Sequence, residues 1–148
     1  MKGQEKLYVA PVIDKLLGSD FASDYSYYVL NSKKITTNDF VAKRIDEIGA
    51  VEIKELKAKK KSKVSIPEKI KDIPVYRLGT AFAENNTYLK EISFGSSISG
   101  IGKNAFKNCI KLKSVTIPAN VKMIGDGAFS QCVNLENVVI QEGIKHIG

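Results

Sequence analysis

From Leu78 to the end of the chain the sequence repeats every 23 residues, and this period constrains the fold more than any other feature. Positions in register carry the same or a similar residue in up to four copies. The repeated columns are Leu78/Ile101/Ile124/Ile147, Gly79/Gly102/Gly125/Gly148, Leu89/Leu112/Leu135, Ile92/Val115/Val138, Phe94/Ile117/Ile140, Ala105-Phe106/Ala128-Phe129 and Cys109/Cys132. Such a period indicates a solenoid, in which each copy is one coil that buries its apolar face against its neighbours.

The first copy departs from this register. Ala81-Phe82 lies 24 residues before Ala105-Phe106, which places Asn85 where cysteine stands in later copies. Further upstream, Val64-Ser65-Ile66-Pro67 matches Val115-Thr116-Ile117-Pro118, with five extra residues within Glu68–Tyr76. We therefore expect a first coil with an inserted loop, as is common at the edge of a repeat array.

Each copy has the pattern of a short strand followed by a turn. Val115 and Ile117 alternate with polar neighbours, which predicts a strand with one buried face. The glycine of each copy suits a backbone position that needs either a positive φ or a close approach of two chains. Ala128-Phe129 predicts the start of a short helical turn whose phenylalanine points inward.

The repeat resembles a known family. Ile117-Pro118-x-x-Val121-x-x-Ile124-Gly125-x-x-Ala128-Phe129-x-x-Cys132-x-x-Leu135-x-x-Val138-x-Ile140 is similar to the BspA-type leucine-rich repeat. Residues 68–75 resemble the longer first repeat of that family, so the resemblance covers about residues 64–148. It implies an adhesion or interaction role, often on a bacterial or protist surface. The predicted fold class is α/β: a leucine-rich-repeat solenoid of about three repeats over 64–148, ending mid-repeat, with an α/β cap over 1–63.

The first 63 residues carry no repeat but do carry local patterns. These predict a helix over 11–17, a strand over 25–30, a second helix over 40–48 capped by Thr37 or Asn38, and a strand from Val51 towards Leu56. The simplest role for this part is to cover the open end of the solenoid.

Residue chemistry argues against an enzyme. The chain has no glycine-rich phosphate loop, no Ser–His–Asp or Cys–His order and no acidic metal cluster, so we expect no catalytic residue, no cofactor and no metal site. The alternatives for Cys109 and Cys132 are a disulfide, a metal site or a column of buried thiols. Their repeat spacing favours the thiol column, because a free cysteine behaves as a small buried hydrophobe.

The formal charge of +7 is spread along the chain. Residues 1–64 hold 13 Lys and Arg against 9 Asp and Glu, and residues 65–148 hold 10 against 7. A dedicated nucleic-acid domain usually concentrates positive charge on one face or segment. The balance instead favours weak, salt-sensitive attraction to acidic partners.

One basic run supports a second interpretation. Lys57, Lys59, Lys60, Lys61 and Lys63 are expected to form a solvated hairpin tip. As an alternative, the predicted 40–48 helix and this hairpin, spanning residues 40–63, have the order of parts of a winged helix that binds nucleic acid. No aromatic or arginine cluster accompanies the lysines, so we expect a protein partner rather than nucleic acid.

The predicted binding surface is the outward face of the repeat strands. Residues between the buried positions of a strand point away from the core. They are Glu91, Ser93, Ser114, Thr116, Asn137 and Val139. These side chains form two columns across three coils, a surface of the kind that repeat proteins use for a protein partner. The alternative is that they only solubilise the sheet.

The two ends of the chain give further expectations. Gly148 stands mid-repeat, so we expect exposed apolar surface at this end. Either further repeats of a longer array cover it, or a second chain covers it by self-association. No apolar run is long enough for a membrane span. The start of the chain lacks a secretory signal, since Pro11, Asp14 and Lys15 break its apolar stretch. This predicts an intracellular protein if the chain is complete, and a surface or secreted one if a signal was removed.

Overall fold

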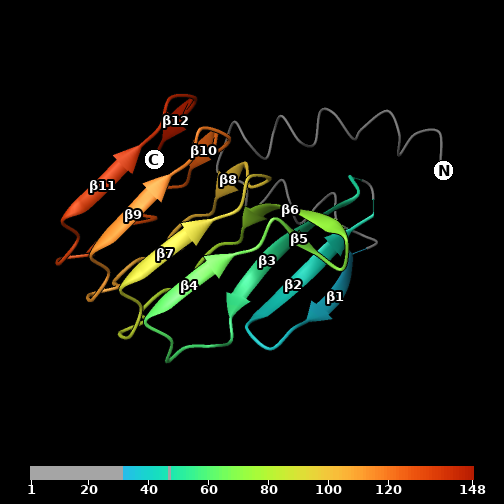
Figure 1. The fold of residues 1–148 in the computed structure, drawn as a ribbon, viewed down its shortest axis with the longest axis horizontal. Helices are drawn as coiled ribbons and strands as arrows, with labels where there is room; N and C mark the ends of the chain where they lie inside the picture. Colours follow the sequence, from blue (N-terminus) through green and yellow to red (C-terminus); the bar gives the residue numbers. More distant parts are fainter. Residues whose placement is uncertain (1–31, 47) are drawn as a thin grey trace.

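A computed structural model describes residues 32–46 and 48–148, and their regular elements are all β-strands (Figure 1). The strands form two sheets that the chain visits in turn. The predicted 11–17 helix and 25–30 strand lie outside the described residues. In the described part the fold is a β-solenoid without a helix, so the predicted α/β class is not confirmed.

The larger sheet begins with an antiparallel hairpin and continues in parallel. Its strands are β1 (Ser32–Thr36), β2 (Phe40–Ile45), β3 (Ala50–Leu56), β6 (Ile73–Leu78), β8 (Gly100–Ile101), β10 (Met123–Ile124) and β12 (His146–Ile147), in that order. Strands β1, β2 and β3 pair antiparallel, whereas β3 pairs parallel with β6. Parallel stacking therefore begins upstream of Val64.

The smaller sheet has four parallel strands, one from each coil. They are β4 (Lys63–Ile66), β7 (Glu91–Phe94), β9 (Ser114–Ile117) and β11 (Asn137–Ile140). Figure 1 shows them side by side, in chain order from green to red. The insertion predicted within residues 68–76 is a small hairpin, in which β5 (Lys69–Ile70) pairs antiparallel with β6.

Backbone hydrogen bonds between coils fix the repeat register. The amides of Ala81, Ala83 and Asn85 donate to the carbonyls of Lys103, Ala105 and Lys107 at 2.7–2.8 Å. The amides of residues 104, 106 and 108 donate in the same way to the carbonyls of 126, 128 and 130. The register is thus 23 residues in the first copy too, and the predicted one-residue shift is wrong. Phe82-Ala83 stands opposite Ala105-Phe106 with the two residue types exchanged.

The predicted helical turn at Ala-Phe is also wrong, because this segment is a series of tight turns. Amide-to-carbonyl bonds join residue 105 to 102, 107 to 104 and 109 to 106. Asn104 and Asn108 lie within these turns with φ values of 55° and 60°. Asparagine tolerates this left-handed conformation better than most residues, and each such residue interrupts a helix.

Aromatic rings fill the centre of the solenoid in a row. The ring centroids of Phe40, Phe82, Phe106 and Phe129 are successively 6.2, 5.8 and 5.2 Å apart. Phe106 is fully buried among the isoleucines and leucines of the repeat columns. Phe40 comes from the hairpin, so β2 contributes to the same core as the repeats. Aromatic pairs of this kind add to the burial of their apolar area.

The predicted helix over 40–48 is wrong, because residues 40–45 form strand β2. Phe40, Ala42 and Ile45 are buried in this strand, and its pairing with β3 has a β-bulge at Val41/Ala42, where Lys54 of β3 is the extra residue. Thr37, the predicted helix cap, instead closes the β1–β2 turn. Its hydroxyl donates to the carbonyl of Phe40 at 3.3 Å and accepts from the amide of Phe40 at 3.0 Å. Short polar side chains cap turns as well as helices.

A buried ion-pair cluster joins β3 and β6 on the face away from the core. The Glu52 carboxylate is fully buried, with Arg77 Nε at 2.9 Å and Lys54 Nζ at 2.9 Å. Glu52 and Arg77 are register partners, while the next pair, Ile53 and Leu78, points into the core. Two cations offset the desolvation of one carboxylate, which a buried charge requires.

The glycine column marks the closest approach of neighbouring coils. A Cβ on Gly102 would lie 2.5 Å from the Gly79 carbonyl carbon and 2.8 Å from the Leu78 carbonyl oxygen. Gly102 and Gly125 do not have a positive φ. Of the two predicted reasons for these glycines, close approach is therefore the one that applies.

We predict that Gly102→Ala will lower the free energy of unfolding by about 3 kcal/mol, because the added methyl group pushes against backbone. Gly49→Ala is the control: Gly49 has a φ of 61° and no neighbour within 4 Å, so it costs only about 1 kcal/mol of backbone strain. Urea denaturation of both variants measures the difference. Equal losses would contradict the close-approach argument.

Candidate protein-interaction surface

The four-stranded sheet presents alternate side chains to solvent. In β7, Glu91 and Ser93 are exposed and Ile92 between them is buried. In β9, Ser114 is half-buried and Thr116 exposed, on either side of buried Val115. The structure therefore places the predicted binding residues of these two strands on the outside.

The strand register lines these residues up in two columns. Glu91 lies opposite Ser114, which lies opposite Asn137, and Thr116 lies opposite Val139. The predicted surface lacks the outward residues of the first strand, where Lys63 pairs with Glu91 and Ser65 with Ser93. The sequence match between residues 64–67 and 115–118 could have indicated that this strand belongs to the surface. The complete surface, called here the sheet face, consists of Lys63, Ser65, Glu91, Ser93, Ser114, Thr116, Asn137 and Val139.

Contacts within the sheet face are polar and weak. Lys63 Nζ lies 3.5 Å from Glu91 Oε2, and the Ser93 hydroxyl donates to the Ser65 hydroxyl at 2.9 Å. A shallow hollow of about 200 Å³ lies over β4, β7 and β9. Both charged side chains of the ion pair are more than half exposed, so the pair contributes little to stability. These groups are available for hydrogen bonds to a partner.

The lysine-rich run, called here the lysine corner (residues 57–63), connects the two sheets. It joins β3 to β4, which belong to different sheets, so it is not the hairpin that we predicted. Lys61 pairs with Asp39 at 3.0 Å and Lys59 with Glu55 at 3.6 Å. Lys57 Nζ donates to the Thr37 carbonyl at 3.0 Å. Since residues 40–45 are a strand, the helix required by the nucleic-acid alternative does not form.

A larger groove of about 570 Å³ lies beside the lysine corner, and sequence reasoning missed it. Nine residues, 54–62, lead from Ile53 to β4, whereas twelve, 79–90, lead from the equivalent Leu78 to β7. The first coil therefore lacks a full turn segment. Leu56 and Phe82 line the resulting groove together with the exposed Tyr88.

Three side chains at one repeat position bridge consecutive coils. The Cys109 and Cys132 thiols donate to the carbonyls of Ala83 and Phe106 at 3.2 and 3.1 Å. In the true register Asn86, not Asn85, stands at the equivalent position in the first copy. Its side-chain amide donates to the Lys59 carbonyl at 3.0 Å and ties the lysine corner to the next coil.

Both cysteines are free thiols. Burial, together with the charge of neighbouring Cys132, raises the pKa of the Cys109 thiol to about 12. Burial also raises the pKa of Cys132. Among residues 32–46 and 48–148, no three His, Cys, Asp or Glu side chains gather as a metal site would require. The same residues hold no helix long and apolar enough to cross a membrane.

The last coil exposes the apolar columns that earlier coils bury. Val138 is 49% exposed, whereas the equivalent Val115 is 3% exposed. Ile140 and Ile147 are exposed to a similar extent as Val138. Strands β11 and β12 each have one partner among the described strands, so each leaves one edge unpaired. At this end the apolar columns and one edge of each sheet are therefore exposed.

The repeated coils match the sequence model of a known protein family. The model of the BspA type leucine rich repeat region matches residues 47–148, in six copies. The chain belongs to this BspA-type leucine-rich repeat family. The match begins upstream of residue 64, as does the parallel stacking of the larger sheet.

Solved structures with the same fold are bacterial leucine-rich repeat proteins. A leucine rich repeat protein of T. pallidum is 27% identical, with a TM-score of 0.72 over 78% of this chain and 54% of that one. One from Bacteroides capillosus is 19% identical, with a TM-score of 0.54 over 73% and 98%. The pneumococcal vaccine antigen PcpA is 15% identical, with a TM-score of 0.55 over 78% and 40%. This chain spans about half of the T. pallidum protein. No curated protein matches the sequence.

We predict that Cys109 of the BspA-type solenoid will resist alkylation. Because its pKa is raised to about 12, Cys109 holds very little of the reactive thiolate at pH 8. Iodoacetamide labelling followed by mass spectrometry should show Cys109 unmodified in the folded protein and modified in urea, with half-buried Cys132 reacting sooner. Because folding raises this pKa, its contribution to stability is complete below about pH 9 and declines towards pH 12. Rapid labelling of Cys109 without urea would contradict the buried thiol column.

Proposed function

We propose that this BspA-type protein is a non-catalytic interaction module that binds a protein partner through the sheet face. The observation that carries the proposal is the alignment of two outward columns across four coils, whose members are polar except for Val139. Repeat solenoids commonly bind through extended surfaces of this kind. The family resemblance supports an adhesion-type role and a surface location, because its members are mostly adhesion and interaction proteins.

The composition of the sheet face suits specific rather than purely electrostatic binding. Its second column offers the hydroxyls of Ser65, Ser93 and Thr116, and its charged pair, Lys63 and Glu91, is balanced. Hydroxyls can both donate and accept, so they match the polar backbone and side chains of a protein surface. No comparison supports nucleic-acid binding.

We predict that Ser114→Arg with Thr116→Arg will abolish capture of the partner, because two long side chains would stand in the middle of the sheet face. The measurement is affinity capture of proteins from the organism's lysate and surface fraction at low and high salt. A discrete protein retained at high salt by the native chain and lost with the double variant is the expected result.

The control variant carries the same charge elsewhere. Thr80→Arg with Thr87→Arg adds two arginines on exposed positions of the segment between β6 and β7, away from the sheet face. This variant should capture the partner like the native chain, and circular dichroism should show both variants folded. Capture that survives the sheet-face change would exclude this surface as the binding site.

A second proposal concerns self-association through the apolar end of the last coil. Val138, Ile140 and Ile147 stand about half exposed at positions that are buried in earlier coils. A second copy of the chain could cover them and pair the open strand edges. The contact would add to, and not replace, binding at the sheet face.

We predict concentration-dependent oligomers in sedimentation velocity, and their loss with Ile147→Lys, because a charge at the contact would have to be desolvated. Tyr88→Lys is the matched control, since Tyr88 is also apolar and 46% exposed but belongs to the second coil. A monomer at every concentration for the native chain would contradict self-association.

A further inference from the structure

The two sheets differ at the end where the solenoid begins. In the larger sheet β2 pairs with β3 and occupies its edge. In the four-stranded sheet β4 pairs only with β7, and no other described strand lies along its second side. Within residues 32–46 and 48–148, the first coil therefore leaves one strand edge open to a further strand.

The hydrogen bonds between β4 and β7 show which groups that edge presents. The carbonyls of Ser62 and Ile66 point towards β7, where they accept from the amides of Lys90 and Gly95. Because peptide groups alternate along a strand, Val64 points the same way and Lys63 and Ser65 point outward. Each of these two residues offers an amide and a carbonyl, and the spacing of two residues is the one that an added strand requires.

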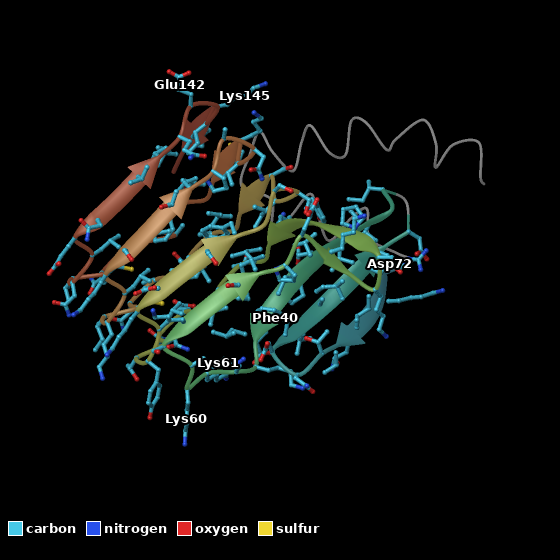
Figure 2. The ribbon with its side chains drawn as sticks, viewed as in Figure 1. Phe40, Lys60, Lys61, Asp72, Glu142 and Lys145 are labelled. Carbon is cyan, nitrogen blue, oxygen red and sulfur yellow. The ribbon has the colours of Figure 1, made fainter. Side chains whose placement is uncertain are left out.

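A hollow of about 220 Å³ adjoins this edge. Phe40, Ala58 and Val64 give it an apolar part, and Asp39, Lys61 and Lys63 give it a charged part. Figure 2 shows Phe40 between the two sheets and Lys61 near the start of β4. The hollow has room for a side chain of a strand that pairs with β4.

The surroundings of the edge carry excess positive charge. Five lysines lie in the lysine corner, and the carboxylates paired with them are Asp39, Glu55 and Glu91. Lys60 is exposed and forms no ion pair with another described residue, and Figure 2 shows it extending away from the ribbon. Such a field attracts acidic groups and disfavours basic ones.

We propose that the outer edge of β4 binds an extended acidic peptide segment of a partner protein, which becomes a fifth strand of the four-stranded sheet. The backbone of Lys63 and Ser65 supplies the pairing, and the lysine corner selects acidic side chains. Lys63, the shortness of β4 and the following Pro67 are features that keep edges from pairing indiscriminately. This proposal is independent of the sheet face, since it uses the edge of the sheet and not its surface.

The test uses the full chain and defined peptides in isothermal titration calorimetry. The probes are a capped hexapeptide of alternating valine and glutamate, its counterpart with lysine in place of glutamate, and the acidic peptide with every amide nitrogen methylated. We expect the acidic peptide to bind at least about tenfold more tightly than both others, because only it has the charge and the backbone donors.

Ser65→Pro removes the outward amide but none of the bonds to β7, and an edge strand tolerates proline at such a position. It should weaken binding of the acidic peptide about tenfold or more. Ser65→Ala is the matched control: it also loses the hydroxyl bond with Ser93 but keeps the amide, and should bind normally. Thermal denaturation checks that both variants fold. If Ser65→Pro does not fold, the methylated peptide still decides whether binding requires backbone pairing.

Three results would overturn the proposal. Absence of binding by the acidic peptide would show that the edge is closed to an added strand. Equal binding by the methylated peptide would show that the lysines attract charge without strand pairing. A single-stranded oligonucleotide that binds more tightly than the peptide and competes with it would show a polyanion site instead. None of these results depends on Ser114 or Thr116, so the sheet-face proposal stands or fails separately.

Discussion

The backbone hydrogen bonds between coils are the constraint on which the rest of the structure depends. The amides of Ala81, Ala83 and Asn85 each donate to the next coil, so neighbouring coils cannot slide against one another. Equivalent residues must then stack, and a position that suits one coil suits all of them. Glycine occupies the position at which the backbones of neighbouring coils nearly touch. Phenylalanine occupies the position at which its ring packs on the ring of the next coil. The columns of the sheet face are a consequence of the same register.

The structural positions that recur in every coil could be predicted from the sequence. Glu91, Ser114 and Asn137 were placed correctly in one outward column because strand alternation and a 23-residue period determine both face and neighbour. Outside the repeat, local spacing was the only guide. The apolar residues at 40, 41, 45 and 48 fit one face of a helix, yet residues 40–45 form strand β2, in which Phe40 and Ile45 are buried and Val41 is only partly so. The spacing of apolar residues alone could not separate these two elements.

The first copy shows how residue identity can mislead when backbone register decides. Matching Ala81-Phe82 to Ala105-Phe106 by type implied a shift of one residue, which the hydrogen bonds exclude. Phe82 instead reaches the aromatic row from the neighbouring position, with its ring centroid 5.8 Å from that of Phe106. Core volume is conserved while the order of two residues is exchanged, as packing allows when total volume is kept. Asn86 then falls in the cysteine column, where its amide can reach the lysine corner.

The candidate sites beyond the sheet face arise where the repeat is broken. The first coil uses nine residues, 54–62, where later coils use twelve, so it lacks the turn segment that would stack on residues 79–85. That shortage opens the groove beside Phe82 and leaves a compact corner rich in lysine. The β1–β2 hairpin continues the larger sheet, and among the described strands only β7 pairs with β4. The regular coils place Lys63, Glu91, Ser114 and Asn137 in one outward column, and the irregular first coil adds a charge excess beside the edge of β4.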